Sequence, residues 1–299
     1  MDITISHSEL QQFRNCEREY KYARLNKIYP RKRGVALYTG SAAHKYIECR
    51  RNGLDDAQAE VNVRSIFDEA KEGGLWDATE LVKLEIEMHR ALAMARAYWT
   101  IYSERDSIEY PKLQTEVELK RKLCDGITYR GFIDCLAQDA AGQWWVHDIK
   151  TASSAAVNPG YFERVAFDNQ VVGYVWLAEK YLGIRPAGVI YDVIVKTQHS
   201  RTQKESSIQF CNRLRDIYIK EGVERDLFHR HEVVIGPKRI EAFEKETRYT
   251  AKFLLSKLRK DKTQWPKNTG NCLKPWGACP YMSICSTGQV SKVNYVRGK

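Results

Sequence analysis

The chain has 299 residues, of which 43% are hydrophobic, so it can bury a substantial core. Its 48 Lys and Arg residues outnumber its 38 Asp and Glu residues, and the resulting net charge of +10 favours a polyanionic partner such as a nucleic acid. The sequence has neither a run of ~18 apolar residues nor a secretion signal, and it lacks the P-loop and dinucleotide-binding motifs, so we expect a cytoplasmic protein that is neither a membrane protein, an ATP-driven motor nor a dinucleotide enzyme.

The first third of the sequence predicts helices. Residues 5–25 have helical spacing of apolar side chains and include Cys16. A basic, turn-rich link at 29–34 follows, which fits a loop near a substrate or, more commonly, a solvated run of charges. A second helix opens at Gly40 and carries His44, and the small residues before His44 allow another backbone to approach closely. Residues 55–105 predict two or three further helices that form a cap.

Strand patterns come next. Residues 113–123 predict a strand that carries Glu116, and residues 129–151 predict a hairpin of two apolar runs joined by a turn at 139–142. Because strand side chains alternate between faces, Asp148 and Lys150 share one face of the hairpin, and pairing can bring Asp134 beside them. Glu116 is then a candidate additional acid on a third strand of the sheet, although an exposed strand glutamate is the commoner case.

The charged residues of the hairpin stand among apolar neighbours, where an isolated charge is costly to desolvate. Asp134 lies within one apolar run, and Asp148 and Lys150 follow the other. Two carboxylates can hold a hard divalent cation, while a lysine stabilises negative charge on a nucleophile or phosphate. The cluster therefore predicts metal-assisted cleavage of a phosphodiester; the simpler alternative is an edge-strand ion pair between Asp148 and Lys150.

The second half of the sequence predicts alternating helices and strands. A helix over 168–182 places Gln170 and Tyr174 four residues apart on one face. Strands are predicted at 187–198 and 232–235, and a long helix runs from Pro237 to about Leu258. From Trp265 onward the tail is rich in Pro, Gly and Cys, so we expect an irregular segment held by something other than a core.

Three of the eight cysteines gather in this tail, in the pattern Cys272-x6-Cys279-x5-Cys285 with Pro275 and other turn residues between them. Such spacing can wrap a chain around a metal or cluster, and Cys16 is the natural fourth ligand. The other cysteines fall inside predicted regular elements and fit core positions, namely Cys49, Cys124, Cys135 and Cys211. A 4Fe-4S cluster, a four-cysteine zinc site and unligated thiols all fit; the lack of C-x2-C knuckles favours iron and sulfur over zinc.

From about residue 8 to 286 the chain resembles the RecB-like branch of the PD-(D/E)XK nuclease superfamily. The resemblance is greatest to phage-type and CRISPR-associated exonucleases with an iron-sulfur cluster, many of which have a shorter cysteine spacing. It rests on motifs in the family's order: Cys16, Gly40-x3-His44, Gly131-Phe132-Ile133-Asp134, Asp148-Ile149-Lys150-Thr151, Gln170-x3-Tyr174 and the closing cysteines. Singly, His44 fits a core or capping histidine, and Gln170 and Tyr174 fit helix packing; their joint occurrence favours the nuclease.

The resemblance implies a role for each of these residues. His44, Asp134, Asp148 and the carbonyl of Ile149 would bind Mg²⁺ or Mn²⁺, and a histidine nitrogen among the ligands favours Mn²⁺. Lys150 would orient or activate the attacking water. Gln170 and Tyr174 would match the family's Q-x3-Y motif, which positions DNA and supports the region of the active-site lysine.

We therefore expect an α/β, restriction-endonuclease-like fold, with a mixed central sheet flanked by helices, in one nuclease domain over 1–299. A helical insertion would span about 50–108, and a cluster-binding tail at about 265–286 would pair with the N-terminal helix, so the cluster's role would be structural. The expected activity is that of a DNA exonuclease, acting on single strands or duplex ends in phage or prokaryotic DNA processing, recombination or repair, with a separate helicase or recombinase as partner. The alternatives are a catalytically inactive nuclease fold that binds DNA or assembles with such a partner, and a metal-cluster scaffold that binds nucleic acid without cleaving it.

Overall fold

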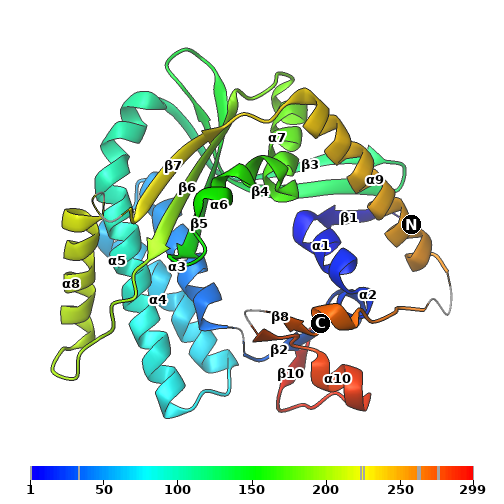
Figure 1. Ribbon diagram of the computed structural model, residues 1–299, viewed down its shortest axis with the longest axis horizontal. Helices are drawn as coiled ribbons and strands as arrows, with labels where there is room; N and C mark the ends of the chain where they lie inside the picture. Colours follow the sequence, from blue (N-terminus) through cyan, green and yellow to red (C-terminus); the bar gives the residue numbers. More distant parts are fainter. Residues whose placement is uncertain are drawn as a thin grey trace.

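The computed structural model describes residues 2–32, 34–222, 224, 226–260, 264–274 and 277–298. Arg33 of the basic link and Pro275 of the tail lie outside these residues. The fold is mixed α/β, with a central sheet flanked by helices, as a restriction-endonuclease-like architecture requires (Figure 1). The expected fold class is therefore confirmed. Within the described ranges, no helix is both long enough and apolar enough to cross a membrane.

The central sheet combines parallel and antiparallel pairing. Its path is β1-β4-β5-β6-β7, and β3 also pairs with β4. The β1–β4 and β5–β6 pairs are parallel, whereas the β3–β4, β4–β5 and β6–β7 pairs are antiparallel. The strands are β1 (Ile3–Ser6), β3 (Lys112–Cys124), β4 (Ile127–Gln138), β5 (Trp144–Ser153), β6 (Gly188–Lys196) and β7 (Phe228–Val233).

Strand β4 has an interruption on one edge. Strand β3 pairs along almost all of β4, so β1 and β5 must share the opposite edge. Strand β1 takes the start of that edge, up to Arg130, and β5 takes its end, from Cys135. Between them, no strand in the described part of the chain pairs with that edge of β4. The gap ends at Asp134, whose carboxylate is thereby free to bond across to β5.

Helices pack against the central sheet and cover it (Figure 1). Helices α3, α4, α5 and α8 pack in succession on one side, where α3 contacts β5 and α5 contacts β6. Helix α7 contacts β4, β5 and β6 and in turn packs against α9 and α1. Their bounds are α1 (His7–Asn15), α2 (Glu17–Tyr20), α3 (Val35–Arg51), α4 (Asp56–Gly73), α5 (Ala78–Glu109), α6 (Pro159–Glu163), α7 (Asn169–Leu182), α8 (Ser207–Glu221), α9 (Pro237–Leu258) and α10 (Met282–Thr287).

The sequence predicted most of the elements from the hairpin onward closely. The hairpin, the helix before residue 182, the strand at β6 and helix α9 all form where their patterns indicated, although β7 begins earlier than expected. The N-terminal expectations need correction. The predicted helix over 5–25 is broken, because Ser6 ends a short strand and caps α1, and Cys16 then adopts an extended backbone. The second helix opens at Val35 instead of Gly40, and α8 was not expected.

The two ends of the chain pack together around a small core of their own. Strand β10 (Tyr295–Arg297) pairs with β2 (Ile28–Pro30), and Tyr281 and Ile284 are buried against them. The ends also meet where Tyr20, the last residue of α2, stacks on Trp265 with their ring centroids 6.0 Å apart. The remaining short elements are a π-helical turn η1 (Lys21–Leu25), the 3₁₀ turns η2 (Val165–Phe167) and η3 (Thr269–Asn271), and the strands β8 (Leu273–Lys274) and β9 (Gly277–Ala278).

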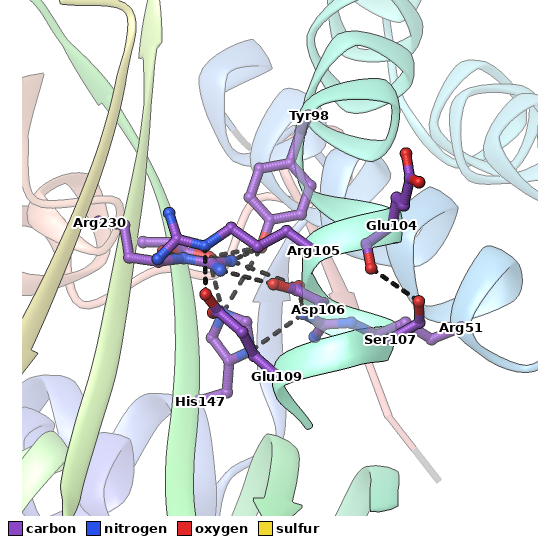
Figure 2. A network of polar contacts seen from close by, with 10 residues as sticks. Arg51, Tyr98, Glu104, Arg105, Asp106, Ser107, Glu109, His147 and Arg230 are labelled. Atoms are coloured by element: carbon purple, nitrogen blue, oxygen red, sulfur yellow. Dashed lines mark hydrogen bonds and ion pairs between the residues drawn. The ribbon is translucent and has the colours of Figure 1, made fainter. Parts of the chain in front are cut away.

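A buried polar network joins the sheet to the helices that cover it (Figure 2). At its centre is Asp192 of β6, which is 1% exposed and accepts a hydrogen bond from Tyr98 of α5. Two nitrogens of Arg230 of β7 also donate to Asp192, both at 2.8 Å. His147 of β5 completes the set, with its Nε2 at 2.7 Å from Asp192. Burial would raise the pKa of Asp192, but the charges and hydrogen bonds of His147 and Arg230 lower it.

The network extends to α3 through a second carboxylate. Asp106 of α5 accepts from Arg230 and, at 3.4 Å, from Arg51 of α3, and Arg51 also lies 3.0 Å from Nδ1 of His147. Two arginines and two carboxylates thus balance their charges in a nearly dry site, which is how buried charges are tolerated. His147 directly precedes Asp148 in β5, so the network anchors the strand at the point where the candidate catalytic residues begin.

We expect Asp106→Ala to lower the free energy of unfolding by about 3–5 kcal/mol, because it would leave Arg51 and Arg230 with too little negative charge in a buried site. Chemical denaturation of the purified variant measures this loss. The matched control is Asp125→Ala, which removes a solvent-exposed partner of Lys122 and should leave the unfolding midpoint unchanged. Equal stability of the two variants would contradict the anchoring role of the network.

Candidate active site

Strand β5 brings a carboxylate and an amine into direct contact. Asp148 is completely buried, and its Oδ1 accepts a hydrogen bond of 2.8 Å from Nζ of Lys150, two residues along the same face. Its other oxygen, Oδ2, is buried with no hydrogen-bond partner in the described part of the chain. A buried acceptor without a partner is costly, so this oxygen is suited to a ligand that supplies positive charge or a proton.

Asp134 reaches the same place from β4. Its Oδ2 accepts a hydrogen bond of 2.9 Å from the backbone N–H of Ile149, which lies between Asp148 and Lys150 in β5. On the other side, Nδ1 of His44 stands 3.3 Å from the same oxygen. Helix α3 supplies His44, and it approaches β5 so closely at Gly40 that a Cβ there would lie 3.2 Å from Oγ1 of Thr151. The expected close approach before His44 is therefore present.

The charges in this cluster shift one another's proton affinities. Burial raises the pKa of Asp148 to about 6, although the nearby charge of Lys150 opposes this rise. Burial would also raise the pKa of Asp134, but His44 and Lys150 outweigh it and lower that pKa to about 2. For Lys150, burial would lower the pKa, and the charges of Asp148 and Asp134 reverse the effect and raise it. The amine therefore stays protonated beside the carboxylates.

Helix α7 places Gln170 and Tyr174 beside the cluster. Nε2 of Gln170 donates to the hydroxyl of Tyr174 at 2.9 Å, and the side chain of Asp168 caps the helix by accepting from the backbone N–H of Gln170. Burial is the larger cause and the charge of Asp148 the second cause of a raised pKa for Tyr174, so its hydroxyl remains a neutral donor near the carboxylates. The ring of Tyr174 leans on Gly131 of β4, where a Cβ would come within 3.1 Å of it.

Glu116 lies opposite Asp134 on β3, at an irregular position. The β3–β4 ladder pairs the residues on either side but skips Glu116 and Asp134, and Glu116 has φ of 48°. A glutamate in the left-handed region is strained, and such strain is common near functional sites. The Glu116 side chain is exposed, as the commoner interpretation of the strand expected. Desolvation by the neighbouring groups and, second, the charge of Asp134 raise the pKa of Glu116.

Two further residues at the site were not singled out from the sequence. Tyr191 of β6 is the parallel partner of Asp148, so its side chain shares the face of the carboxylate. Arg130 of β4 lines a pocket with Gln170 and Tyr174, and its buried Nε has no partner among the described residues. The sequence predicted a strand that contains Tyr191. The β5–β6 register that sets Tyr191 beside Asp148 joins residues far apart in the chain, so local patterns could not predict it.

Cysteines at both ends of the chain share one neighbourhood. The backbone N–H of Asn268 lies 3.4 Å from Sγ of Cys16, and Sγ of Cys272 lies 3.9 Å from the carbonyl of the same Asn268. The backbone N–H of Cys279 donates to the carbonyl of Cys272 at 2.7 Å. Burial raises the pKa of Cys279 and of Cys285, and negative charge on Cys16 adds to both shifts. Of the cysteines expected in the core, Cys49, Cys135 and Cys211 are buried and Cys124 is partly exposed.

Among the residues that the structure describes, no group of three or more His, Cys, Asp or Glu side chains is arranged to hold a metal ion. Near the sheet, the donors are paired with protein groups instead, because Asp134 is held by His44 and Ile149, and Asp148 by Lys150. The free Oδ2 of Asp148 and the neighbouring carboxylate still form a donor set that suits a hard divalent cation. For the cysteines nothing comparable supports a cluster, which stays a prediction.

A family model described as the PD-(D/E)XK nuclease superfamily matches residues 4–286, nearly the whole chain. Among solved structures, the crystal structure of SSO0001 is similar at 13% sequence identity and a TM-score of 0.41, with 96% of this chain and 87% of that chain covered. No curated protein matches. The range matched by the family model includes every candidate residue of the site, from His44 on α3 to Tyr174 on α7.

Proposed function

The chain belongs to the PD-(D/E)XK nuclease superfamily, which implies a metal-dependent nuclease with nucleic acid as its substrate, and on this premise we propose that it is a DNA exonuclease. One observation supports metal-dependent cleavage in this proposal. A fully buried carboxylate, Asp148, is paired on one oxygen with Lys150 and open on the other, beside the second carboxylate of Asp134. A structural ion pair alone would not require the unpartnered oxygen.

Asp134 and Asp148 would hold Mg²⁺ or Mn²⁺, with His44 and the carbonyl of Ile149 as further ligands. When bound, the metal would polarise the phosphate and lower the pKa of water. His44 supports Mn²⁺ more than an all-oxygen site would. Glu116 would contribute as an additional acid at the rim, since its pKa already responds to the charge of Asp134.

The side chains around the carboxylates would stabilise developing charge and position the DNA. Lys150, kept protonated by Asp148, would donate hydrogen bonds to the negative charge that develops as water attacks the phosphorus in line. Asp134 orients the β5 backbone through the N–H of Ile149, so the two strands hold their side chains in register. Gln170 and Tyr174 would position the DNA backbone and keep the lysine region in place, which agrees with their mutual hydrogen bond.

We further propose one nuclease domain over residues 1–299, with a helical insertion at about 50–108, because a single hydrophobic cluster includes side chains of that helical region and of the sheet. Exonuclease action is proposed from the family resemblance, as are a RecB-like subtype, phage or prokaryotic DNA processing, and a helicase or recombinase partner. The alternative of a nuclease fold without activity is disfavoured by the presence of Asp134, Asp148 and Lys150 together.

We also propose a structural 4Fe-4S cluster held by Cys16 and the tail cysteines Cys272, Cys279 and Cys285. The shared contacts of Cys16 and Cys272 with Asn268 support their proximity, and the tail already packs on the N-terminal segment through Tyr20 and Trp265. Bringing the thiols into ligating positions would require a local rearrangement. A cluster there would close a loop of almost the whole chain and so stabilise the joined ends.

Lys150→Ala is expected to abolish cleavage while leaving DNA binding largely intact, because it removes the charge that stabilises the reacting phosphate but neither carboxylate. The assay incubates anaerobically purified protein with end-labelled single- and double-stranded linear DNA in Mn²⁺, Mg²⁺ or EDTA. The matched control is Lys252→Ala on α9, which should cleave as the wild type does. Released mononucleotides or a ladder, abolished by EDTA, would establish the nuclease and its polarity.

Two outcomes of this assay would count against the proposal. If the wild type retained DNA in every metal condition without digesting it, the inactive, DNA-binding alternative would replace the nuclease. If Lys150→Ala lost binding as severely as cleavage, Lys150 would be a structural or phosphate-anchoring residue instead.

For the cluster, Cys279→Ala should yield a colourless protein without iron or acid-labile sulfide, and its thermal unfolding midpoint should fall. Visible absorbance, iron and sulfide analysis and a thermal melt measure these effects. Cys124→Ala, at a partly exposed cysteine of β3, is the control and should keep both colour and midpoint. A colourless Cys279→Ala with an unchanged midpoint would show that the cluster is not structural, and an iron-free wild type would remove the cluster itself.

A further inference from the structure

A pocket opens beside the carboxylates on the face of the sheet that carries Asp148. Its volume is about 420 Å³, within the range of about 300–1,000 Å³ that small-molecule sites occupy. Three aromatic rings, an arginine, a carboxylate and a valine line it, namely Tyr161, Phe167, Tyr191, Arg164, Asp168 and Val165. The nuclease chemistry proposed above uses neither the three aromatic residues nor Arg164.

The pocket adjoins the site through two residues, one paired with Asp148 in the sheet and one hydrogen-bonded to Gln170. Tyr191 is the register partner of Asp148 in the parallel β5–β6 pair. Asp168 caps α7 and accepts from the N–H of Gln170, so the pocket wall continues directly into the helix that presents Gln170 and Tyr174. A polymer whose phosphate lies at Asp148 would therefore have its neighbouring nucleotide at this pocket.

Phe167 is presented rigidly to solvent at the pocket wall. Its side chain is 72% exposed, although its backbone is fixed on both sides. The N–H of Phe167 donates to the carbonyl of Arg164 at 2.9 Å, and its own carbonyl accepts from Arg239 at 3.1 Å. Val165 is buried beneath the same turn. An exposed phenylalanine on a fixed backbone is costly to hydrate and serves readily as a stacking surface.

The other pocket residues add a second ring and a positive charge. Tyr161 contacts Tyr191, with their ring centroids 6.5 Å apart. Arg164 is exposed, and Nε donates to the carbonyl of Gly160, while its terminal nitrogens have no partner among the described residues. Aromatic faces interleaved with an uncommitted guanidinium are the combination that binds unpaired nucleobases and their phosphates.

We propose that Phe167, Tyr161 and Arg164 form a nucleobase-binding subsite, in which an unpaired base next to the scissile phosphate stacks on Phe167. The inference rests on the proposed function for the identity of the ligand as a nucleic acid. It adds that the reacting end is bound with its base unpaired from any complementary strand. A base inside a duplex has both faces covered by its neighbours and cannot occupy such a pocket.

The test compares binding of two fluorescent probes in EDTA, a single-stranded oligothymidylate and a blunt-ended duplex of two complementary strands. Phe167→Ala should weaken binding of the single strand on the order of tenfold, as loss of one stacked base does, and leave binding of the duplex unchanged. Phe167→Trp should restore single-strand binding, because a larger ring stacks at least as well. Tyr249→Ala on α9, another exposed aromatic at 78%, is the control and should bind as the wild type.

Equal binding of the single strand by Phe167→Ala and the wild type would overturn the subsite. An equal loss on both probes would overturn the assignment to an unpaired base. Arg164→Gln gives a second reading, with weaker single-strand binding expected at low salt. Fluorescence anisotropy in EDTA is independent of cleavage, so failure of the nuclease assay with Mn²⁺ would refute the proposed function while an observed loss of binding in Phe167→Ala would still support the subsite.

Discussion

The structure depends on the burial of one carboxylate. Asp148 is fully removed from solvent in the centre of a sheet, where a lone negative charge would be prohibitively costly, and it is tolerated because Lys150 neutralises one of its oxygens. Burial raises the pKa of Asp148, and the charge of Lys150 opposes this rise. Its Oδ2 has no partner among the described residues, so the protein compensates the negative charge only in part, and a cation at that oxygen would compensate the rest. The same desolvation would strengthen the interaction of Lys150 with a reacting phosphate.

The architecture serves this constraint from two sides. On one side, the edge of β4 that β1 and β5 share has no described strand partner at Asp134, so its carboxylate can accept from the N–H of Ile149 and lie beside His44 of α3. On the other side, the buried network around Asp192 and His147 ties β5 to the covering helices immediately before Asp148. The carboxylates and Lys150 are therefore carried by sheet residues whose backbone is held in place, while further side chains that would meet substrate come from α7 and the turn at Phe167.

Local patterns in the sequence were sufficient for much of this. Alternation in the hairpin placed Asp148 and Lys150 on one face, and the turn at 139–142 predicted the pairing that brings Asp134 near them. Helical spacing placed Gln170 beside Tyr174. The unpredicted features are long-range or depend on single backbone angles. The extended backbone of Cys16 breaks the first helix, and the parallel β5–β6 register, which sets Tyr191 beside Asp148, cannot be obtained from either strand alone. The network around Asp192 likewise unites residues from α3, α5, β5, β6 and β7.

We propose that the buried carboxylate of Asp148 is a cation ligand. Calorimetric titration of Mn²⁺ into the wild type and into Asp148→Asn, with Asp216→Asn on α8 as a surface control, tests it without any substrate. We expect the wild type and the control to bind Mn²⁺ and the folded Asp148→Asn protein to lose that binding, because the amide keeps the shape but not the charge. Equal Mn²⁺ binding by all three proteins would show that Asp148 is not a cation ligand and would leave Asp148 and Lys150 as a structural ion pair.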